Sequence, residues 1–160
     1  MQEPRIETTT PKHIAGKRLS MTYAADRTSE LFRSFMPHRN LIENLTGDEV
    51  YAVNVFMPGT TPATITTETV FEKWAAIEVT EPGNLPEGME HFILPGGMYA
   101  IFIHKGPAAA FARTFGFIFG TWLPVSGFQF DANRPRFEKI NHGYRPDDPE
   151  AEEEIWIHIQ

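Results

Sequence analysis

One acidic residue in the sequence has a setting that suggests ligand chemistry. Glu138 lies between Phe137 and Lys139 within residues 136–141, a short stretch that predicts a strand. Its side chain is therefore expected to point opposite to those of both neighbours. A carboxylate at the base of an aromatic pocket loses hydration, and a cationic ligand offsets that cost, while aromatic walls add cation–π attraction. The alternative is a surface glutamate paired with Lys139 or Arg136.

Aromatic side chains are numerous enough to line such a pocket as well as to fill a core. The chain has 13 Phe and 3 Trp, and ligand pockets favour aromatic walls. In the predicted strand 155–159, isoleucine alternates with Trp156 and His158. The isoleucine face is the expected core, which leaves Trp156 for the pocket. The other predicted ligand-binding residues are Trp74 and Phe56, on the corresponding strands of the first half, with Tyr51 and Tyr99.

The elements that must position these residues occur twice in the same order, strand–strand–helix–strand–strand. Hydrophobic patterning and Pro/Gly turn signals predict, in the first half, strands over 5–9, 14–23, 50–56 and 71–79 and a helix that ends at Met36. In the second half they predict strands over 92–94, 98–104, 136–141 and 155–159 and a helix over 107–123. Strands interleaved with single helices indicate an α+β fold, a pseudo-duplicated pair of halves with each helix on a curved, mainly antiparallel sheet.

Both predicted helices have recognisable ends. Asp26 or Thr28 is expected to cap the first helix, and Pro37 is expected to stop it. Pro107 suits the first turn of the second helix, and Pro124 is expected to prevent its continuation. The second helix carries aromatic residues at helical spacing, which favours packing in the core over lining a pocket. These residues are Phe111, Phe115 and Phe119.

Composition excludes several classes of function. The 160 residues suit one domain, 1–160. A net charge of −7 argues against nucleic acid as a direct partner, because such binding needs a basic surface. The sequence has no cysteine, no metal-ligand spacing among its six histidines and no phosphate-binding glycine loop, so we expect no metal and no cofactor. No apolar run approaches the roughly 20 residues that cross a membrane, and the polar N-terminus does not read as a secretory signal, so a cytoplasmic protein is expected.

Several short strings follow one another in an order that is typical of one family. They are LFRSFMP at 31–37, VYAV at 50–53, LPGGMYAIF at 94–102, HKGP at 104–107, GTWLPVSG at 120–127, RFE at 136–138 and EIWIHI at 154–159. Together they resemble the GyrI-like domain, the AraC-type effector-binding domain of bacterial transcription activators. The resemblance covers nearly the whole chain.

The resemblance implies two similar halves with a ligand cleft between them. It implies that the cleft lies on the sheet face turned away from the helices, with Phe137 toward the helices and Glu138 in the cleft. In the family, the glutamate of the RFE-like motif recognises cationic drugs, and Glu138 takes that role by similarity. The family often has a tyrosine two residues later, where this chain has Ile140. A mechanism that needs that hydroxyl would have to take it from Tyr99, Tyr51 or Tyr23.

These observations predict a protein that binds small amphipathic, cationic organic molecules. Multidrug-binding effector domains, which are related to transcription regulation, bind ligands of this kind. Met1 lies almost directly before the first predicted strand, so no DNA-reading domain is expected here. One alternative is a hydrolase of reactive cyclopropane-bearing electrophiles that uses the cleft glutamate. Another is a protein-interaction role, as in relatives that protect DNA gyrase. The sequence favours binding over catalysis and identifies no protein partner.

Overall fold

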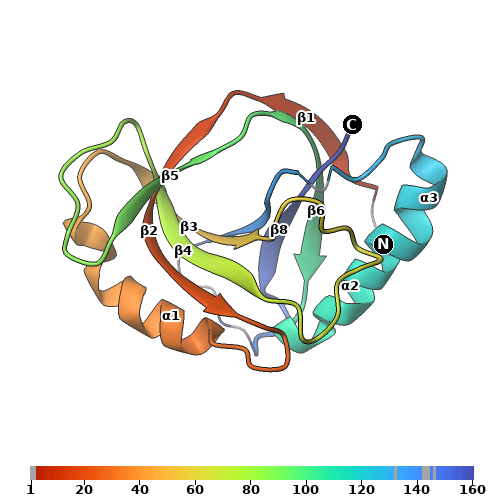
Figure 1. Ribbon diagram of the computed structural model, residues 1–160, viewed down its shortest axis with the longest axis horizontal. Helices are drawn as coiled ribbons and strands as arrows, with labels where there is room; N and C mark the ends of the chain where they lie inside the picture. Colours follow the sequence, from red (N-terminus) through yellow and green to blue (C-terminus); the bar gives the residue numbers. More distant parts are fainter. Residues whose placement is uncertain (1–2, 132, 142–144, 146) are drawn as a thin grey trace.

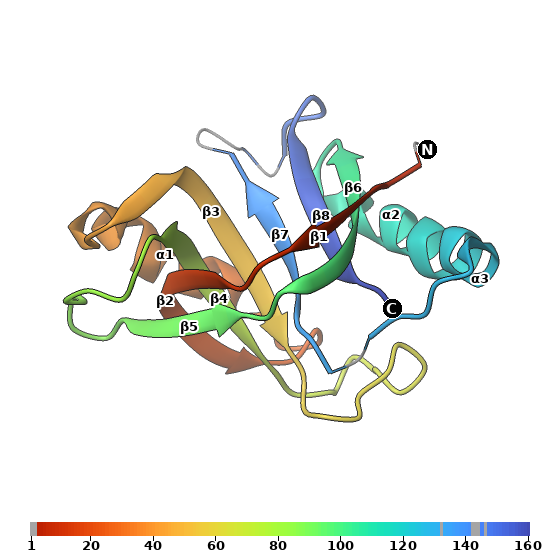
Figure 2. The ribbon, with the colours of Figure 1, turned by 90° about the horizontal axis from the view of Figure 1, so that it is seen from above.

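In the part of the chain that the structure describes, eight antiparallel strands form one sheet that curls round on itself (Figures 1 and 2). The computed structural model describes residues 3–131, 133–141, 145 and 147–160. The strands are β1 (Arg5–Thr9), β2 (Lys12–Met21), β3 (Leu45–Val55), β4 (Phe71–Val79), β5 (Glu90–Leu94), β6 (Gly97–Lys105), β7 (Arg136–Ile140) and β8 (Glu152–His158).

The strand order is symmetric about the contact between β7 and β3. It runs β1-β6-β8-β7-β3-β4-β2-β5, so β6-β8-β7 of the second half mirror β2-β4-β3 of the first, and the first strand of each half, β1 or β5, pairs at the outer edge with a strand of the other half. The two halves meet where Ala52 of β3 pairs with Glu138 of β7. The order confirms the predicted α+β fold with two strand–strand–helix–strand–strand halves.

The sheet curls because β1 continues into β2, and β5 into β6, as two long bent strands. The pairing of Thr9 with Gly97 between β1 and β6 continues in the same register as the pairing of Lys12 with Leu94 between β2 and β5. Gly96 lies at this bend, where a Cβ atom would approach the carbonyl oxygen of Thr9 to 2.7 Å. The close approach of the two backbones therefore requires glycine there.

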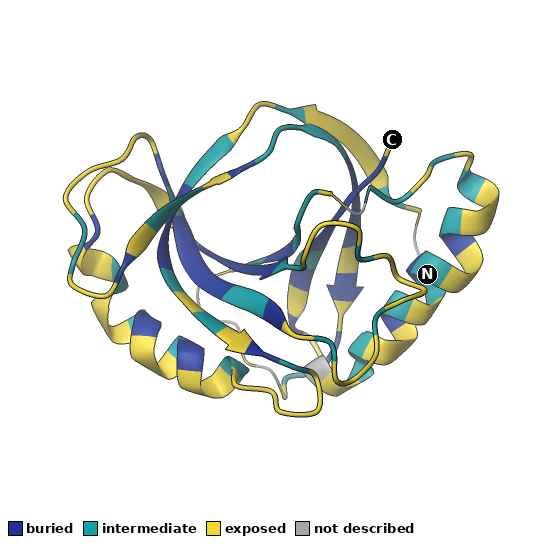
Figure 3. Cartoon of the chain, viewed as in Figure 1, coloured by how far each residue is buried: buried dark blue, intermediate teal, exposed yellow. Residues whose placement is uncertain are grey.

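Buried residues are concentrated in the strands of the sheet (Figure 3), and hydrophobic clusters lie on both of its faces. A cluster inside the curl contains the aromatic residues Tyr51, Trp74, Tyr99, Phe137 and Trp156. Two further clusters lie on the outer face, one beneath each helix, and include Leu31 and Phe35 in the first half and Ile118, Ile155 and Ile157 in the second. The central strands therefore have a packed core on one side and the helix layer on the other.

The first helix, α1 (Thr28–Phe35), packs on β2 and β4. Asp26 Oδ1 accepts a hydrogen bond of 2.8 Å from the backbone N–H of Thr28, which satisfies one of the free donors at the helix start. Leu31 and Phe35 are fully buried on one face. After Phe35 the chain tightens into the 3-10 helix η1 (Met36–Leu41), so Pro37 lies in the first turn of a second helical segment.

The second helix is longer than predicted. Its consecutive segments are η2 (Ala108–Ala110), α2 (Phe111–Phe117), the π-helical turn η3 (Ile118–Trp122) and α3 (Leu123–Ser126). The prediction that Pro124 ends it is wrong, because Pro124 lies in the first turn of α3, where a proline costs no hydrogen bond. The helix ends at Gly127, whose φ of 81° is the left-handed conformation of a C-terminal cap.

Candidate functional site

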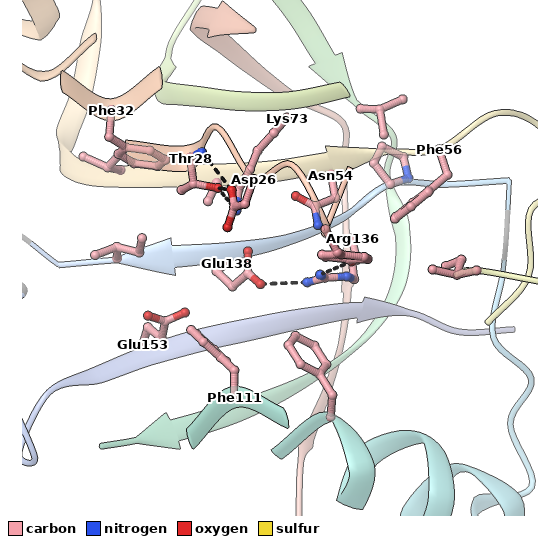
Figure 4. Close-up of a pocket in the computed structure, with 18 of the residues that line it drawn as sticks. Asp26, Thr28, Phe32, Asn54, Phe56, Lys73, Phe111, Arg136, Glu138 and Glu153 are labelled. Atoms are coloured by element: carbon pink, nitrogen blue, oxygen red, sulfur yellow. Dashed lines mark hydrogen bonds and ion pairs between the residues drawn. The ribbon is translucent and has the colours of Figure 1, made fainter. Parts of the chain in front are cut away.

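A cavity of about 1000 Å³ lies between α1 and α2, over the central strands β3 and β7 (Figure 4). Its walls are largely aromatic: Phe32 comes from α1, Phe111 and Phe115 come from α2, and Phe119 from η3. Phe56, which follows β3, closes one side. The volume is at the upper end of the range of small-molecule pockets, roughly 300–1000 Å³.

The floor of the cavity is polar because alternate residues of three neighbouring strands face it. Arg136 of β7 pairs with Asn54 of β3, which in turn pairs with Lys73 of β4. Two residues further along β7, Glu138 pairs with Ala52. All five residues line the cavity. The small side chain of Ala52 leaves room above the carboxylate.

The strongest interaction on the floor is an ion pair between Arg136 and Glu138. Arg136 Nη1 donates to Glu138 Oε1 over 2.7 Å, and both side chains are nearly buried. The guanidinium carbon also lies 4.6 Å from the centroid of the Phe115 ring, within cation–π range. Burial has the largest single influence and lowers the pKa of Arg136, but the charge of Glu138, the nearby Tyr23 and the hydrogen bonds to both together outweigh it, and the pKa is raised. Arg136 is therefore a permanent cation in the cavity.

Tyr23, before α1, lines the same cavity. Its hydroxyl oxygen accepts a hydrogen bond of 3.3 Å from Arg136 Nη2. One guanidinium thus joins a phenol and the carboxylate of Glu138.

A second polar group lies at the α1 end of the floor. Lys73 Nζ donates to Thr28 Oγ1 over 3.1 Å, and Thr28 Oγ1 donates to Asp26 Oδ1 over 2.5 Å. The ammonium of Lys73 is thus tied to the start of α1 through a hydroxyl. It has no direct carboxylate contact comparable to that of Arg136 among the described ion pairs.

Asn54 and Glu153 are further buried polar groups of the cavity. Asn54 is 2% exposed, and its Oδ1 atom has no hydrogen-bond partner in the described part of the chain. Glu153, from β8, is 4% exposed. Buried polar atoms are almost always hydrogen-bonded. The amide of Asn54 therefore has unused bonding capacity facing a cavity.

The structure brings Glu138 and Phe56 together at this cavity but not the other predicted residues. Trp156, Trp74, Tyr51 and Tyr99 pack in the cluster inside the curl, on the opposite face of the sheet. The alternation of β8 was predicted with the isoleucines as core, and Ile155 and Ile157 do pack beneath the second helix. The expectation for the other face needs correction, because there Trp156, Trp74 and Tyr99 pack in a second core, and Tyr51 borders a small hollow of about 200 Å³.

The same correction applies to the direction of Glu138. Phe137 points into the curl and packs against Trp156, with ring centroids 5.1 Å apart. Glu138 therefore faces the helix layer, and the cavity lies on the same face as the helices. The implied placement of the cleft on the far face is wrong.

The aromatic residues of the second helix also need a correction. Phe111, Phe115 and Phe119 were expected to pack in the core; each is partly buried and packs against the core beneath the second helix, but each also lines the cavity. Helical spacing identifies the inward face of a helix. It does not show whether that face meets a sheet or a hollow.

Arg136, Asn54 and Lys73 are cavity residues that the sequence analysis did not propose as ligand contacts. One signal was available for Arg136, which precedes Glu138 by two residues and must share its face in a strand. The positions of Asn54 and Lys73 depend on the registers between β7, β3 and β4. No local pattern encodes these registers.

Among the described residues, no helix is long and apolar enough to cross a membrane. Nor does any group of three or more His, Asp or Glu side chains there have a geometry that would hold a metal ion.

Comparisons with known proteins identify the family. The model of the GyrI-like small-molecule-binding domain matches residues 2–160. The transcriptional regulator BrlR of Pseudomonas aeruginosa is 30% identical over 148 residues, which are 91% of this chain and 51% of BrlR. The chain thus spans about half the length of this curated relative.

Solved structures show the same fold at low identity. SAV2435 bound to tetraphenylphosphonium has a TM-score of 0.71 at 11% identity, covering 99% of this chain and 94% of that one. The C-terminal domain of EcmrR has a TM-score of 0.70 at 12% identity, covering 99% and 97%. With the family model over nearly its full length, the chain belongs to the GyrI-like small-molecule-binding domains, which are related to the effector-binding domains of transcription regulators.

Proposed function

We propose that the cavity binds small amphipathic organic cations and that Glu138 selects for their positive charge. The observation that carries this proposal is the position of Glu138, 7% exposed on the cavity floor and facing the aromatic residues of α2. A buried carboxylate is stabilised by a cation, a place that the Arg136 guanidinium takes in this structure, and aromatic faces attract cations. A lipophilic cation meets both requirements and also fills the apolar walls.

The choice of probe follows from the size of the cavity and from a structural neighbour. The volume of about 1000 Å³ suits a ligand with several rings. SAV2435, which shares the fold, was solved with tetraphenylphosphonium. This ion has a weakly hydrated charge inside an apolar shell, which matches a carboxylate surrounded by phenyl rings.

Calorimetric titration with tetraphenylphosphonium and tetraphenylborate tests the proposal, because the two ions have nearly the same shape and opposite charge. We expect the cation to bind the wild type at least tenfold more tightly. Glu138→Gln keeps the size of the side chain and removes its charge, so it should weaken cation binding about 10- to 100-fold, or about 1.4–2.8 kcal/mol. Glu7→Gln, on the exposed edge strand β1, is the matched control and should change nothing. Equal binding of the two ions, or an unchanged cation affinity in Glu138→Gln, would refute the proposal.

We also propose that this domain makes no direct contact with nucleic acid. The net charge of −7 disfavours a phosphate backbone as a partner, because such binding is driven by Lys and Arg side chains. This chain matches about half of the transcriptional regulator BrlR, and we expect the DNA contacts of BrlR in its other half.

One observation favours a second candidate function, hydrolysis of a reactive small electrophile. Tyr23 and Glu138 both line the cavity and contact the same guanidinium. A phenol and a carboxylate so placed are suitable as acid and base for the attack of water. Incubation with a cyclopropane-bearing electrophile should then give ring opening that both Tyr23→Phe and Glu138→Gln abolish. A rate equal to that of buffer would exclude this candidate.

A further inference from the structure

Arg136 occupies the place that the proposed function assigns to the cation of a ligand. Its guanidinium contacts the Glu138 carboxylate at 2.7 Å and lies 4.6 Å from the centroid of the Phe115 ring. These are the two interactions, ion pairing and cation–π attraction, that would hold an organic cation. A ligand cation and the Arg136 guanidinium would therefore compete for the same carboxylate and the same ring.

Asn54 offers Arg136 a second position. The two residues form a cross-strand pair between β3 and β7, and such pairs have Cβ atoms about 5 Å apart. Asn54 Oδ1 is buried and has no hydrogen-bond partner in the described residues. A buried acceptor without a partner is costly, and a guanidinium that turned toward it would remove that cost. Figure 4 shows Asn54 next to Arg136 on the cavity floor.

We propose that Arg136 is a displaceable internal counter-ion that determines which cations the cavity accepts. Arg136 holds Glu138 in the unliganded state and turns toward Asn54 when a lipophilic cation binds. This inference rests on the proposed function, because it assigns a role to a second residue of the same site.

The arrangement explains how a cavity can keep a charged floor and still be selective. A ligand must break the ion pair before it reaches Glu138, so its apparent affinity is its intrinsic affinity multiplied by the fraction of molecules in which the pair is open. Small hydrated cations have no apolar surface to offset that loss. Cations with several aromatic rings gain contacts with the phenylalanine walls, and the ion pair therefore selects large lipophilic monocations.

Removing the competitor should strengthen binding. Arg136→Met keeps the apolar stem of the side chain and removes its charge. Measured by calorimetry at pH 8, this variant should bind tetraphenylphosphonium at least tenfold more tightly than the wild type. The matched control is Lys73→Met, which removes another cation of the same cavity floor that is bonded to the Thr28 hydroxyl. It should raise the affinity no more than about threefold, through the loss of one like charge alone. In the Glu138→Gln background, Arg136→Met should bring no gain.

The outcomes separate this inference from the proposed function. If the wild type does not prefer tetraphenylphosphonium over tetraphenylborate, the proposed function fails and this inference fails with it. If the preference exists and Glu138→Gln removes it, but Arg136→Met gains no more affinity than Lys73→Met, then this inference alone is overturned.

Two further measurements apply if Arg136→Met does not fold. Asn54→Leu removes the second position of the guanidinium and should weaken tetraphenylphosphonium binding at least threefold, whereas unchanged binding contradicts the exchange of partners. In the wild type, the Nε–Hε nuclear magnetic resonance signal of Arg136, assigned by its absence in Arg136→Lys, should shift on saturation with tetraphenylphosphonium. A signal that stays in place at saturation means that Arg136 does not move and overturns the inference.

Discussion

His158 makes the protein sensitive to acid through the cluster inside the curl. The residue lies on β8, is fully buried, and its ring centroid is 4.1 Å from that of Tyr99. Burial, together with the nearby positive charge of Arg134, lowers the pKa of His158 to about 3. The folded protein therefore keeps the imidazole neutral at pH values where the unfolded chain protonates it.

The size of the effect follows from proton linkage. In the unfolded chain His158 has an ordinary pKa of about 6.5, so between pH 6.5 and pH 3 the unfolded state binds one proton more than the folded state. The free energy of unfolding therefore falls as pH falls through this window and is unaffected by His158 above it. The loss is about 2 kcal/mol at pH 5 and approaches about 5 kcal/mol near pH 3.

Urea unfolding of the wild type and of His158→Leu at pH 7 and pH 5 measures this contribution. The leucine variant has no titrating group at this position, so its free energy of unfolding should fall about 2 kcal/mol less between the two pH values. The difference between two pH values is used because the substitution also changes packing, and that change cancels. His38→Gln, at an exposed position of η1, should retain the pH dependence of the wild type. If His158→Leu loses as much stability on acidification as the wild type, the reasoning is refuted.

Two other substitutions test how the sheet is held in its curled shape. Gly16→Ala should lower the free energy of unfolding, measured in urea, by about 3 kcal/mol, because the new Cβ would lie 2.0 Å from the carbonyl oxygen of Ala75. Gly47→Ala is the control and should be near neutral, because its Cβ would have nothing within 4 Å. Arg134→Met should lower the melting temperature by about 10 °C, from a loss of about 3 kcal/mol, because Arg134 bonds Asp131 and the carbonyl oxygens of Gly96 and Ile159. An equal loss in the exposed Arg33→Met would show that these bonds contribute little.

Local patterns in the sequence were sufficient for the order of elements. Alternating residues marked the strands, and the phenylalanines at helical spacing marked the second helix, so the duplicated α+β fold was predicted correctly. The turn at Gly96 was also readable, since it depends on residues close in sequence, whereas the N-cap position of α1 is held by Arg27 and not by the predicted Asp26 or Thr28. Pro124 misled because a proline stops a helix only from its interior, and here it lies in the first turn of a new segment.

The site was less predictable because it depends on which face of the sheet is hollow. Alternation correctly separated Phe137 from Glu138 and Trp156 from Ile155, yet both faces of these strands are covered. Which face holds a cavity is decided by the gap between two helices that are far apart in sequence. Trp156, which was predicted to line the pocket, therefore packs in a core, and Phe115, which was predicted to pack in the core, lines the cavity.

The cavity floor indicates that function and stability compete at the contact between the two halves. A buried ion pair is seldom more stabilising than well-packed apolar side chains of the same volume, and a buried acceptor without a partner is a direct cost. Both occur side by side here, in Arg136 with Glu138 and in Asn54, at the centre of a sheet whose other face is packed with aromatic side chains. A chain selected for stability alone would fill this position with hydrophobic residues. The charged floor is what the proposed binding of a cation requires, since such a ligand would exchange these partners at Glu138.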